Sequence, residues 1–293
     1  MLAGVGVTYL AHARPGQVRL ARTANLQPQL GEEVIRLPHD TDDDTVAFSE
    51  RVLTGFLAHV RREGAPVRPG RGGSPRWDAC MKRLIYAAAS DEERMPEVVH
   101  QYLRLGFSVG PHVREMIADE RVAALDDLAR FVLNECEHTR QFVRFSHMVD
   151  GSYLASFSPK ANTIPLVAPY FAARMGPERF CLVDPRHRIA AFHEADTRGC
   201  TLVRLDTQLA SALANRHDLA DDEAYVRIMW QRFYRNTATP GRDRAQRGYD
   251  LRMHWMPRRL WDGLLELDEP TPQSVAIPAR YQGGDGLLKP ARS

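Results

Sequence analysis

The chain has 293 residues, of which 39 are lysine or arginine and 37 are aspartate or glutamate, so its formal net charge is +2. This near balance excludes a polybasic protein that coats nucleic acid through charge alone. Hydrophobic residues make up 44% of the chain and charged residues 26%, proportions that fit a globular protein with a buried core and not a disordered chain. Only three of the basic residues are lysines, and arginine binds phosphate and stacks on flat rings in ways that lysine cannot.

The first residues, MLAGVGVTYLAHARPG, are apolar but lack the basic start and the cleavage site of a signal peptide. No apolar run approaches the roughly 18 residues that a membrane span requires. We therefore expect a cytoplasmic protein without membrane contact that begins with a buried β-strand. The four cysteines form no C-x-x-C pair, which favours buried, reduced thiols over a zinc or iron–sulfur site.

Residues 1–65 are expected to form a strand, a loop and a helix. The acidic run at residues 40–44 is placed to cap a helix that carries Val46, Val52 and Phe56. Residues 64–75 include seven glycines or prolines, which is the strongest linker signal in the chain. The expected parts are a strand–helix segment (1–65), a flexible linker or loop (66–76), an α+β domain (77–268) and a poorly ordered tail (269–293).

Helical patterns dominate the first half of the expected α+β domain. One apolar stripe begins at Trp77, and a second, through Val98 and Tyr102, stops at Gly106. Gly110-Pro111 favours a short helix with proline in its first turn. The strongest helix prediction covers residues 121–145, where apolar residues recur at spacings of three, four and seven.

The apolar pattern changes to a period of two after Gly151, which predicts a strand around residues 153–157. Further strands are predicted over residues 180–184, 189–193 and 201–205, the first two joined by an Asp184-Pro185 turn. A last helix is predicted over residues 222–236. This order predicts an α+β fold in which helical segments pack on a small antiparallel β-meander.

The small net charge conceals one strongly basic stretch. Between Arg227 and Trp261 stand nine arginines and two acids, a local charge of +7, interleaved with six aromatic residues. Arginine together with aromatic side chains is typical of surfaces that hold phosphates and stack unpaired bases. The alternative is an aromatic core beneath a solvated basic face. It is favoured for the helix over residues 222–236, and both interpretations remain open for the loop over residues 237–253.

A second basic group stands at the end of the long helix, in ECEHTRQFVRFSH. His138, Arg140, Arg144 and His147 approach a helix C-terminus, whose dipole favours cations, so capping is the first interpretation. Arg140 and Arg144 are four residues apart and would point the same way on a helix. The second interpretation is therefore that these two arginines hold a phosphate.

Two Glu-x-x-His pairs are candidates for a metal site. Glu97 with His100 and Glu135 with His138 would each share a helix face, as in di-metal helical bundles. The further long helices with inward glutamates that such a site needs are missing, so we expect neither a metal nor a cofactor. The HExxH, G-x-S-x-G, Walker A and G-x-G-x-x-G motifs are also absent from the sequence.

Several motifs occur together and in order over residues 77–267. They are YLRLGFSVG (102–110), EHTRQFVRF (137–145), DGSYLASFSPKANTIPLVAPYFAARM (150–175), LVDPRHRIAAF (182–192) and MPRRLW (256–261). Together they resemble a bacterial family of DNA repair or DNA metabolism proteins, a domain of unknown function encoded beside a radical-SAM protein associated with DNA repair or modification. The same domain also occurs fused to uracil-DNA glycosylase-like domains. The resemblance implies a role in DNA repair as the accessory half of a two-gene system.

The resemblance carries over polar positions but no established catalytic residue. The matching positions are His138, Arg144, Asn162, Asp184, Arg188 and Arg258. Tyr170 departs from the family pattern, which has a histidine there, and the loop over residues 242–254 is longer and richer in arginine than usual. Glu97 and His100 do not match either, which lowers the expectation of a metal site further.

The preferred hypothesis is a DNA-binding accessory protein that presents damaged or single-stranded DNA to a radical-SAM enzyme. The residues expected to contact the nucleic acid are Arg140, Arg144, Asn162, Arg188, Arg232, Arg242, Arg244, His254, Arg258 and Arg259.

The alternative is an enzyme that acts directly on a DNA base or nucleotide. His138 would be its general base, with Arg144, Asn162 and Arg258 as anion-holding residues. His193 and His254 could also serve as an acid or a base, although a lone histidine is more often structural. A protein-binding module without DNA contact is a third hypothesis, favoured if the arginines are scattered over opposite faces.

Overall fold

The computed structural model of the chain describes residues 2–12, 18–21, 34, 43–60, 79–236, 256 and 258–264. Contacts divide the chain into two compact units, which are treated separately below. Unit 1 comprises Met1–Glu135 and Lys160–Asn162, and unit 2 comprises Cys136–Pro159 and Thr163–Ser293. The predicted linker, the basic loop over residues 237–253 and the predicted tail lie outside the described residues.

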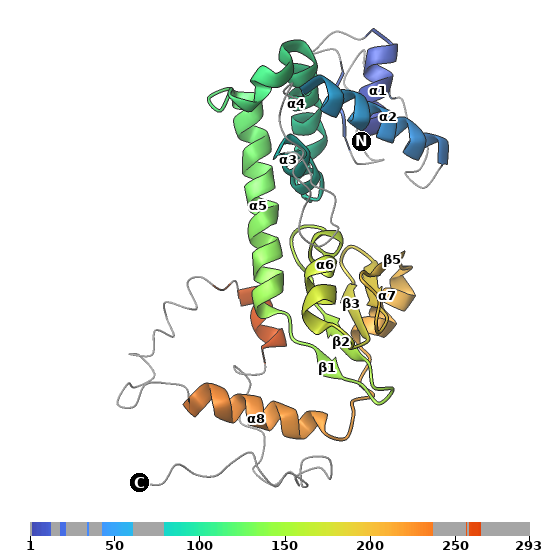
Figure 1. The fold of residues 1–293 in the computed structure, drawn as a ribbon, viewed down its shortest axis with the longest axis vertical. Coiled ribbons are helices and arrows are strands. Elements are labelled where there is room, and N and C mark those ends of the chain that lie inside the picture. Colours follow the sequence, from blue (N-terminus) through green and yellow to red (C-terminus); the bar gives the residue numbers. More distant parts are fainter. Residues whose placement is uncertain are drawn as a thin grey trace. The chain divides into compact units, whose positions relative to one another are not determined.

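Unit 1 is helical in its described part (Figure 1). Its elements are α1 (Leu2–Leu10), α2 (Asp43–Val60), α3 (Ala79–Ala88), α4 (Met95–Val109), the 3-10 helix η1 (Gly110–Arg114) and α5 (Glu120–Phe142), whose last residues belong to unit 2. The predicted helix that carries Phe56 is confirmed as α2, and the predicted long helix is confirmed as α5. Gly110-Pro111 opens η1 as predicted.

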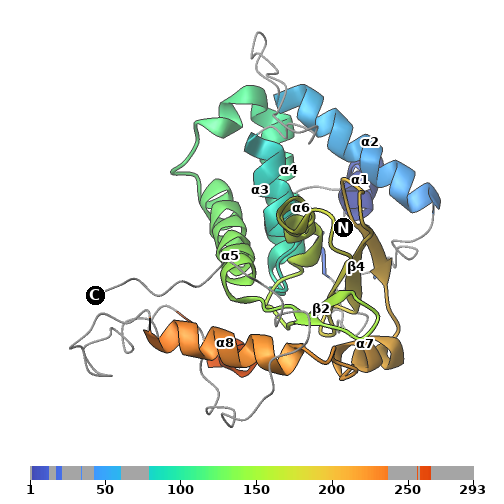
Figure 2. The ribbon, with the colours of Figure 1, turned by 60° about the horizontal axis from the view of Figure 1, so that its bottom comes forward.

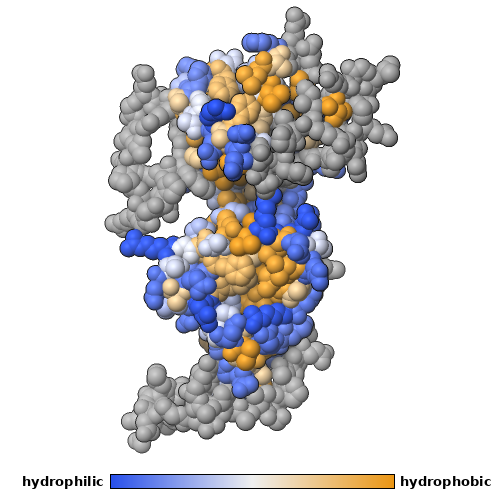
Figure 3. All heavy atoms as spheres, turned by 90° about the vertical axis from the view of Figure 1, so that its right-hand side faces the viewer, coloured by the Kyte–Doolittle hydropathy of each residue, from blue (hydrophilic) through white to orange (hydrophobic). Residues whose placement is uncertain are grey.

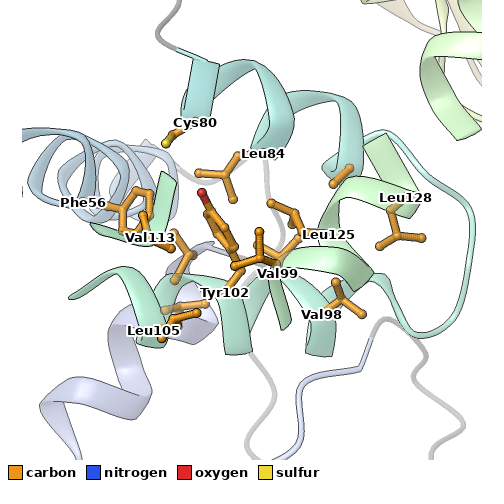
Figure 4. Packing of buried hydrophobic residues seen from close by; sticks show 14 of the residues in the cluster. Phe56, Cys80, Leu84, Val98, Val99, Tyr102, Leu105, Val113, Leu125 and Leu128 are labelled. Atoms are coloured by element: carbon orange, nitrogen blue, oxygen red, sulfur yellow. The ribbon is translucent and has the colours of Figure 1, made fainter. Parts of the chain in front are cut away.

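One apolar core joins α2, α3, α4, η1 and the first part of α5 (Figure 4). Phe56 and Tyr102 are fully buried in it, with their ring centroids 5.9 Å apart. Leu84, Val113 and Leu125 also belong to this cluster. Segments from both sides of the expected linker therefore share a core, while the four-part division of the chain remains a prediction.

The first segment is a helix, so the prediction of a buried β-strand is wrong. Leu2–Leu10 forms α1, packs on α2 and buries Val5 in the core of unit 1. Gly6 allows the close approach, because a Cβ atom there would lie only 2.5 Å from Cζ of Phe48. An apolar segment with valine and threonine favours a strand locally, but its packing partner here is the apolar face of a helix.

α4 continues past Gly106, so the predicted helix end at that residue is also wrong. Gly106 is a packing position, because a Cβ atom there would lie 2.4 Å from Cε2 of Phe56 and 3.3 Å from Cγ1 of Val60. The helix ends instead at Gly110, whose φ of 60° lies in the left-handed region that favours glycine.

The described part of unit 2 contains a five-stranded sheet with helices around it (Figures 1 and 2). Its elements after α5 are β1 (Ser146–His147), β2 (Tyr153–Ser156), α6 (Ile164–Met175), β3 (Phe180–Asp184), β4 (Ile189–His193), β5 (Thr201–Arg204), α7 (Thr207–Ala214), α8 (Glu223–Asn236) and the 3-10 helix η2 (Arg258–Gly263). The strand order is β1-β2-β3-β4-β5, and most neighbours are antiparallel. The predicted α+β class is therefore confirmed.

One strand pair departs from a simple meander. β2 and β3 run parallel, with Tyr153 opposite Phe180, because α6 forms the crossover between them. α6 packs on β3 and β4, whereas α7 packs on the other face of the sheet, where Val183 and Ala190 are buried (Figure 2). Neither α6 nor α7 is among the elements predicted from the sequence.

The predicted hairpin between β3 and β4 is confirmed. The Asp184 carboxylate is fully buried, and its Oδ1 accepts hydrogen bonds from the backbone N–H groups of Arg186 and His187 at 2.9 and 3.1 Å. Oδ2 contacts Nδ1 of His187. Aspartate at the start of the turn therefore fixes the turn through its own side chain.

β5 is the outer strand of the sheet, and all four of its residues are exposed. Leu202 of β5 and Leu209 of α7 are each 46% exposed, and Figure 3 shows hydrophobic surface on this side of unit 2. The strand is short and ends with Arg204, two features that limit edge-to-edge pairing. Among the described residues, no helix combines the length and the apolarity that crossing a membrane requires.

Candidate nucleic-acid interface

Arg140 lies against an exposed tyrosine at the C-terminal end of α5. Its guanidinium carbon is 5.6 Å from the centroid of the Tyr170 ring, and Tyr170 is 40% exposed on α6. Arg140 also forms an ion pair with Glu137, one turn earlier on α5. Tyr170 is the position where the related pattern has a histidine, and in this chain it provides a ring for a cation–π contact.

Arg144 stands two residues beyond the end of α5, and its side chain turns back toward the helix. Its Nη1 donates hydrogen bonds to the carbonyl oxygens of Gln141 and Val143 at 3.0 and 3.3 Å. Arg144 therefore caps the helix C-terminus, and the helical-spacing argument that pairs it with Arg140 does not apply. Its guanidinium carbon also lies 5.7 Å from the centroid of the Trp230 ring on α8.

The apolar face of α8 is exposed, so the expectation that its aromatic residues belong to a core is wrong. The side chains on this face are 41, 44, 36 and 59% exposed, for Val226, Met229, Trp230 and Phe233 in that order. The Trp230 and Phe233 rings stack with their centroids 5.8 Å apart and their planes 29° apart. α8 thus presents a flat aromatic pair at its surface.

Polar contacts hold the start of α8 against β1. Glu223 accepts hydrogen bonds from the backbone N–H of His147 at 3.0 Å and from Nε of Arg227 at 2.8 Å. Nη2 of Arg227 donates to Oγ of Ser146 at 2.9 Å, and Nδ1 of His147 lies 3.0 Å from Oδ1 of Asp222. These contacts attach the start of α8 to β1, and Ile228 is buried while Val226, Met229, Trp230 and Phe233 stay exposed.

These contacts define an arginine–aromatic surface on unit 2, made of Arg140, Arg144, Tyr170, Trp230 and Phe233. The two arginines stand four residues apart around the end of α5, and each lies over an aromatic ring from another helix. Trp230 and Phe233 were identified in the sequence by composition alone, and Tyr170 only as a departure from the related pattern. Their partners were not, because the contacts join residues that are 30 to 86 positions apart.

The remaining candidate residues belong to α8, η2, the β3–β4 turn or unit 1, or lie outside the described residues. Arg232 is exposed on α8, and Arg259 is half-buried in η2. Arg188 is exposed in the β3–β4 turn, where its φ is 53°. Asn162 belongs to unit 1. Arg242, Arg244, His254 and the side chain of Arg258 lie outside the described residues.

The Glu-x-x-His pairs make structural contacts. Oε2 of Glu97 accepts a hydrogen bond from the backbone N–H of Leu20 and lies 3.8 Å from Nδ1 of the buried His100, which lowers the pKa of Glu97. Glu135 is buried and accepts a hydrogen bond from the backbone N–H of Lys160 at 2.8 Å. Within the described ranges, no three histidine, cysteine, aspartate or glutamate side chains gather as a metal site requires.

The histidines considered as acids or bases have different surroundings. His193 is buried, and its Nδ1 and Nε2 lie 2.7 and 2.9 Å from the carbonyl oxygens of Gly199 and Gly176, so its role is structural. His138 is half-buried near the end of α5, with its ring centroid 6.1 Å from that of Phe142. A general-base role for His138 remains a prediction.

The thiols of unit 2 are expected to react slowly. Burial raises the pKa of Cys181 to about 12 and the pKa of Cys200 to about 11. The reactive thiolate is therefore scarce at pH 8, and alkylation of Cys200 by iodoacetamide should be about a hundredfold slower in the folded protein than in urea. Mass spectrometry of the alkylated peptides measures the rates. Equal rates in the folded and unfolded protein would contradict the buried environment.

The fold and the surface define an α+β protein whose second unit holds half-buried arginines against exposed aromatic rings. A family model described as a domain of unknown function, DUF4130, matches residues 93–266, which is more than half of the chain. The chain belongs to this family. Neither a search of curated proteins nor a search of solved structures found a significant match.

Proposed function

We propose that this protein binds DNA as an accessory in DNA repair or DNA metabolism and presents damaged or single-stranded DNA to a radical-SAM enzyme. The observation that carries the DNA-binding part is the arginine–aromatic surface of unit 2. The partner and the repair setting rest on the motifs shared with the family of DNA repair or DNA metabolism proteins named in the sequence analysis.

The chemistry of the surface suits an unpaired strand better than a closed duplex. Trp230 is 36% exposed and Phe233 is 59% exposed, and every unpaired base offers a flat face that can stack on an aromatic ring at a surface. In a duplex the base faces are already covered by their neighbours. The flanking arginines supply the positive charge that holds the phosphates.

The ion pair at Arg140 does not prevent phosphate binding. Glu137 is 48% exposed, and exposed ion pairs contribute only about 0 to 1 kcal/mol. A phosphate can therefore replace the carboxylate at small cost. The cation–π contact with Tyr170 keeps the guanidinium at the surface while the exchange takes place.

Fluorescence anisotropy tests the DNA-binding part directly. A labelled single strand of about 12 nucleotides is titrated with the protein, and a duplex of the same length serves as competitor. Tighter binding of the single strand is expected. The logarithm of the association constant should fall linearly with the logarithm of the salt concentration, with a slope of about −1.4 for two neutralised phosphates.

A matched pair of variants distinguishes DNA binding at the arginine–aromatic surface from a general effect of positive charge. Arg140→Ala removes a guanidinium from the proposed surface, whereas Arg130→Ala removes one from an exposed position of the same helix in unit 1. Affinity should fall, and the salt slope should become shallower, in Arg140→Ala alone. No binding of any DNA at low salt, or equal losses in both variants, would overturn the proposal.

The proposed association with a radical-SAM enzyme needs a separate experiment. Purification of the protein together with the enzyme encoded beside its gene should give a stable complex or a DNA-dependent one on size-exclusion chromatography. Independent elution of the two proteins, with and without DNA, would overturn this part and leave the DNA-binding part to the anisotropy measurement.

A further inference from the structure

β5 is the last strand of the sheet in unit 2 and presents one side of its backbone outward (Figure 1). β4 pairs with it on the inner side, and all four residues of Thr201–Arg204 are exposed. In the part of the chain that the structure describes, no further strand follows on the outer side. Such an edge can pair with a strand from another molecule.

The ladder to β4 shows which backbone groups of β5 point outward. The N–H of Leu205 donates to the carbonyl oxygen of Arg188 at 2.8 Å, and Leu202 stands opposite Ala191 three positions earlier. In an antiparallel ladder only alternate pairs exchange hydrogen bonds, so Leu202 belongs to a pair of the other kind. The N–H and C=O groups of Leu202 therefore point away from β4.

The side chains at this edge are apolar on both faces of the sheet. Val203 stands opposite Ala190, on the face that α7 covers, and is 36% exposed. Leu202 has its side chain on the other face, because successive side chains of a strand alternate, and is 46% exposed. A strand that pairs with β5 gains apolar contacts on both faces.

β5 is complementary to β5 of a second copy around a two-fold axis at Leu202. In an antiparallel pair on this axis, the two Leu202 residues stand opposite each other and exchange both backbone hydrogen bonds. Thr201 of each copy then stands opposite Val203 of the other, which places two β-branched side chains together. This pairing uses the outward backbone groups and joins the apolar side chains on both faces.

Charged residues on either side of β5 favour this register over its neighbours. Arg198 and Asp206 are both exposed and stand four residues before and after Leu202, so each faces the opposite charge of the other copy. A displacement by two residues brings Arg204 opposite Arg198 in one direction and opposite Leu202 in the other. Like charges directly opposite each other destabilise a strand pair, and both displacements lose the contact between the two leucines.

The contact is small, so the expected dimer is weak. The short strand and its terminal Arg204 limit pairing with unrelated strands, but on the Leu202 axis Arg204 stands opposite Cys200 and not opposite a charge of its own sign. The exposed pair of Arg198 with Asp206 adds little stability and mainly selects the register. A dissociation constant of about 10 to 100 μM is expected, as for small, transient interfaces.

We propose that two copies of the chain associate through their β5 strands and form one continuous sheet across a two-fold axis. The occupant of the sheet edge is a second copy, in the register that places Leu202 against Leu202. The inference goes beyond DNA binding, because no residue of the arginine–aromatic surface takes part in it.

Sedimentation velocity of the full chain without DNA tests the association. The wild type, Leu202→Asp and Leu133→Asp are compared over about a hundredfold range of concentration around the expected dissociation constant. Leu202→Asp brings two carboxylates together on the axis and should raise the dissociation constant about tenfold or more. Leu133 is 42% exposed on α5, so the same change there should have no effect. Circular dichroism verifies that all three proteins are folded.

A disulfide trap tests the register. Leu202→Cys places two thiols opposite each other, with their Cα atoms about 5.5 Å apart, which a disulfide can span. Thr201→Cys is the control, because its counterpart lies two residues along the other strand, beyond the limit of about 7 Å. Oxidised glutathione should link two copies of Leu202→Cys through position 202, and peptide mass spectrometry identifies the bond.

The expected results are weaker association in Leu202→Asp alone and faster cross-linking of Leu202→Cys than of Thr201→Cys. A wild type that stays monomeric at the highest concentration overturns the inference. Equal association of the three proteins, or an equal loss in both aspartate variants, also overturns it, and so does equal cross-linking of the two cysteine variants. These outcomes do not depend on DNA, so they are distinct from the success or failure of the proposed function.

Discussion

Phe56→Ala is expected to lower the free energy of unfolding of unit 1 by about 3 to 5 kcal/mol, the usual range for loss of a buried phenylalanine ring. Phe56 is fully buried and its ring lies 5.9 Å from that of Tyr102 and 5.3 Å from that of Phe107. Removal of the ring leaves a cavity where α2 meets α4. Urea denaturation followed by circular dichroism measures the change, and a loss below about 1 kcal/mol would contradict the described core.

Substitution of Gly106 tests the contact between α4 and the Phe56 ring of α2 more specifically. Gly106→Ala places a methyl group against the Phe56 ring and should destabilise the wild type by about 1 to 3 kcal/mol. In the Phe56→Ala background the Phe56 ring is absent, so Gly106→Ala should lower the free energy of unfolding far less. Gly55 has open space around its Cβ position, and Gly55→Ala should stabilise α2 by about 0.5 to 1 kcal/mol. Equal effects of Gly106→Ala in the two backgrounds would contradict the packing.

Trp230→Ala is expected to weaken binding of a single strand by about 10 to 100-fold, because stacking of one base on an aromatic ring contributes about 1 to 3 kcal/mol. Phe233→Ala should cause a comparable loss, since the two rings stack on each other and both are exposed. The same anisotropy titration measures both variants.

The matched control for this effect is Met229→Ala. Met229 lies on the same face of α8 and is 44% exposed, but it has no flat ring on which a base can stack. Its replacement should change the affinity less than about threefold. A loss in Met229→Ala as large as that in Trp230→Ala would indicate that general apolar area, and not aromatic stacking, governs the binding.

Periodicity and turn chemistry were sufficient to predict most of the elements. α5 and α8 have clear helical spacing, and Asp184-Pro185 marks the hairpin. α6 escaped prediction because its segment IPLVAPYFAARM is apolar on all sides and contains Pro169, which argues against a helix. α1 and the end of α4 were misjudged for a shared reason. Gly6 and Gly106 mark close approach to α2, a tertiary contact that local sequence does not reveal.

The candidate site could be predicted in composition but not in arrangement. The apolar stripe of α8 indicated a core position. The start of α8 is instead held by contacts of Asp222 and Glu223 with His147 and of Arg227 with Ser146, over separations of 75 to 81 residues that the local sequence does not reveal. The clustering of arginine with aromatic residues was visible in the sequence. The pairing of Arg144 with Trp230 required the fold.

The most direct test of the central claim is to map where a bound strand touches the protein. A single-stranded oligonucleotide of about 12 nucleotides is cross-linked to the full chain by ultraviolet light at low salt, and the modified peptides are identified by mass spectrometry. Cross-links are expected on the peptides that contain Tyr170 and the Trp230–Phe233 pair, and they should disappear at high salt. Cross-links confined to other peptides, or none at low salt, would contradict the assignment of this surface to DNA.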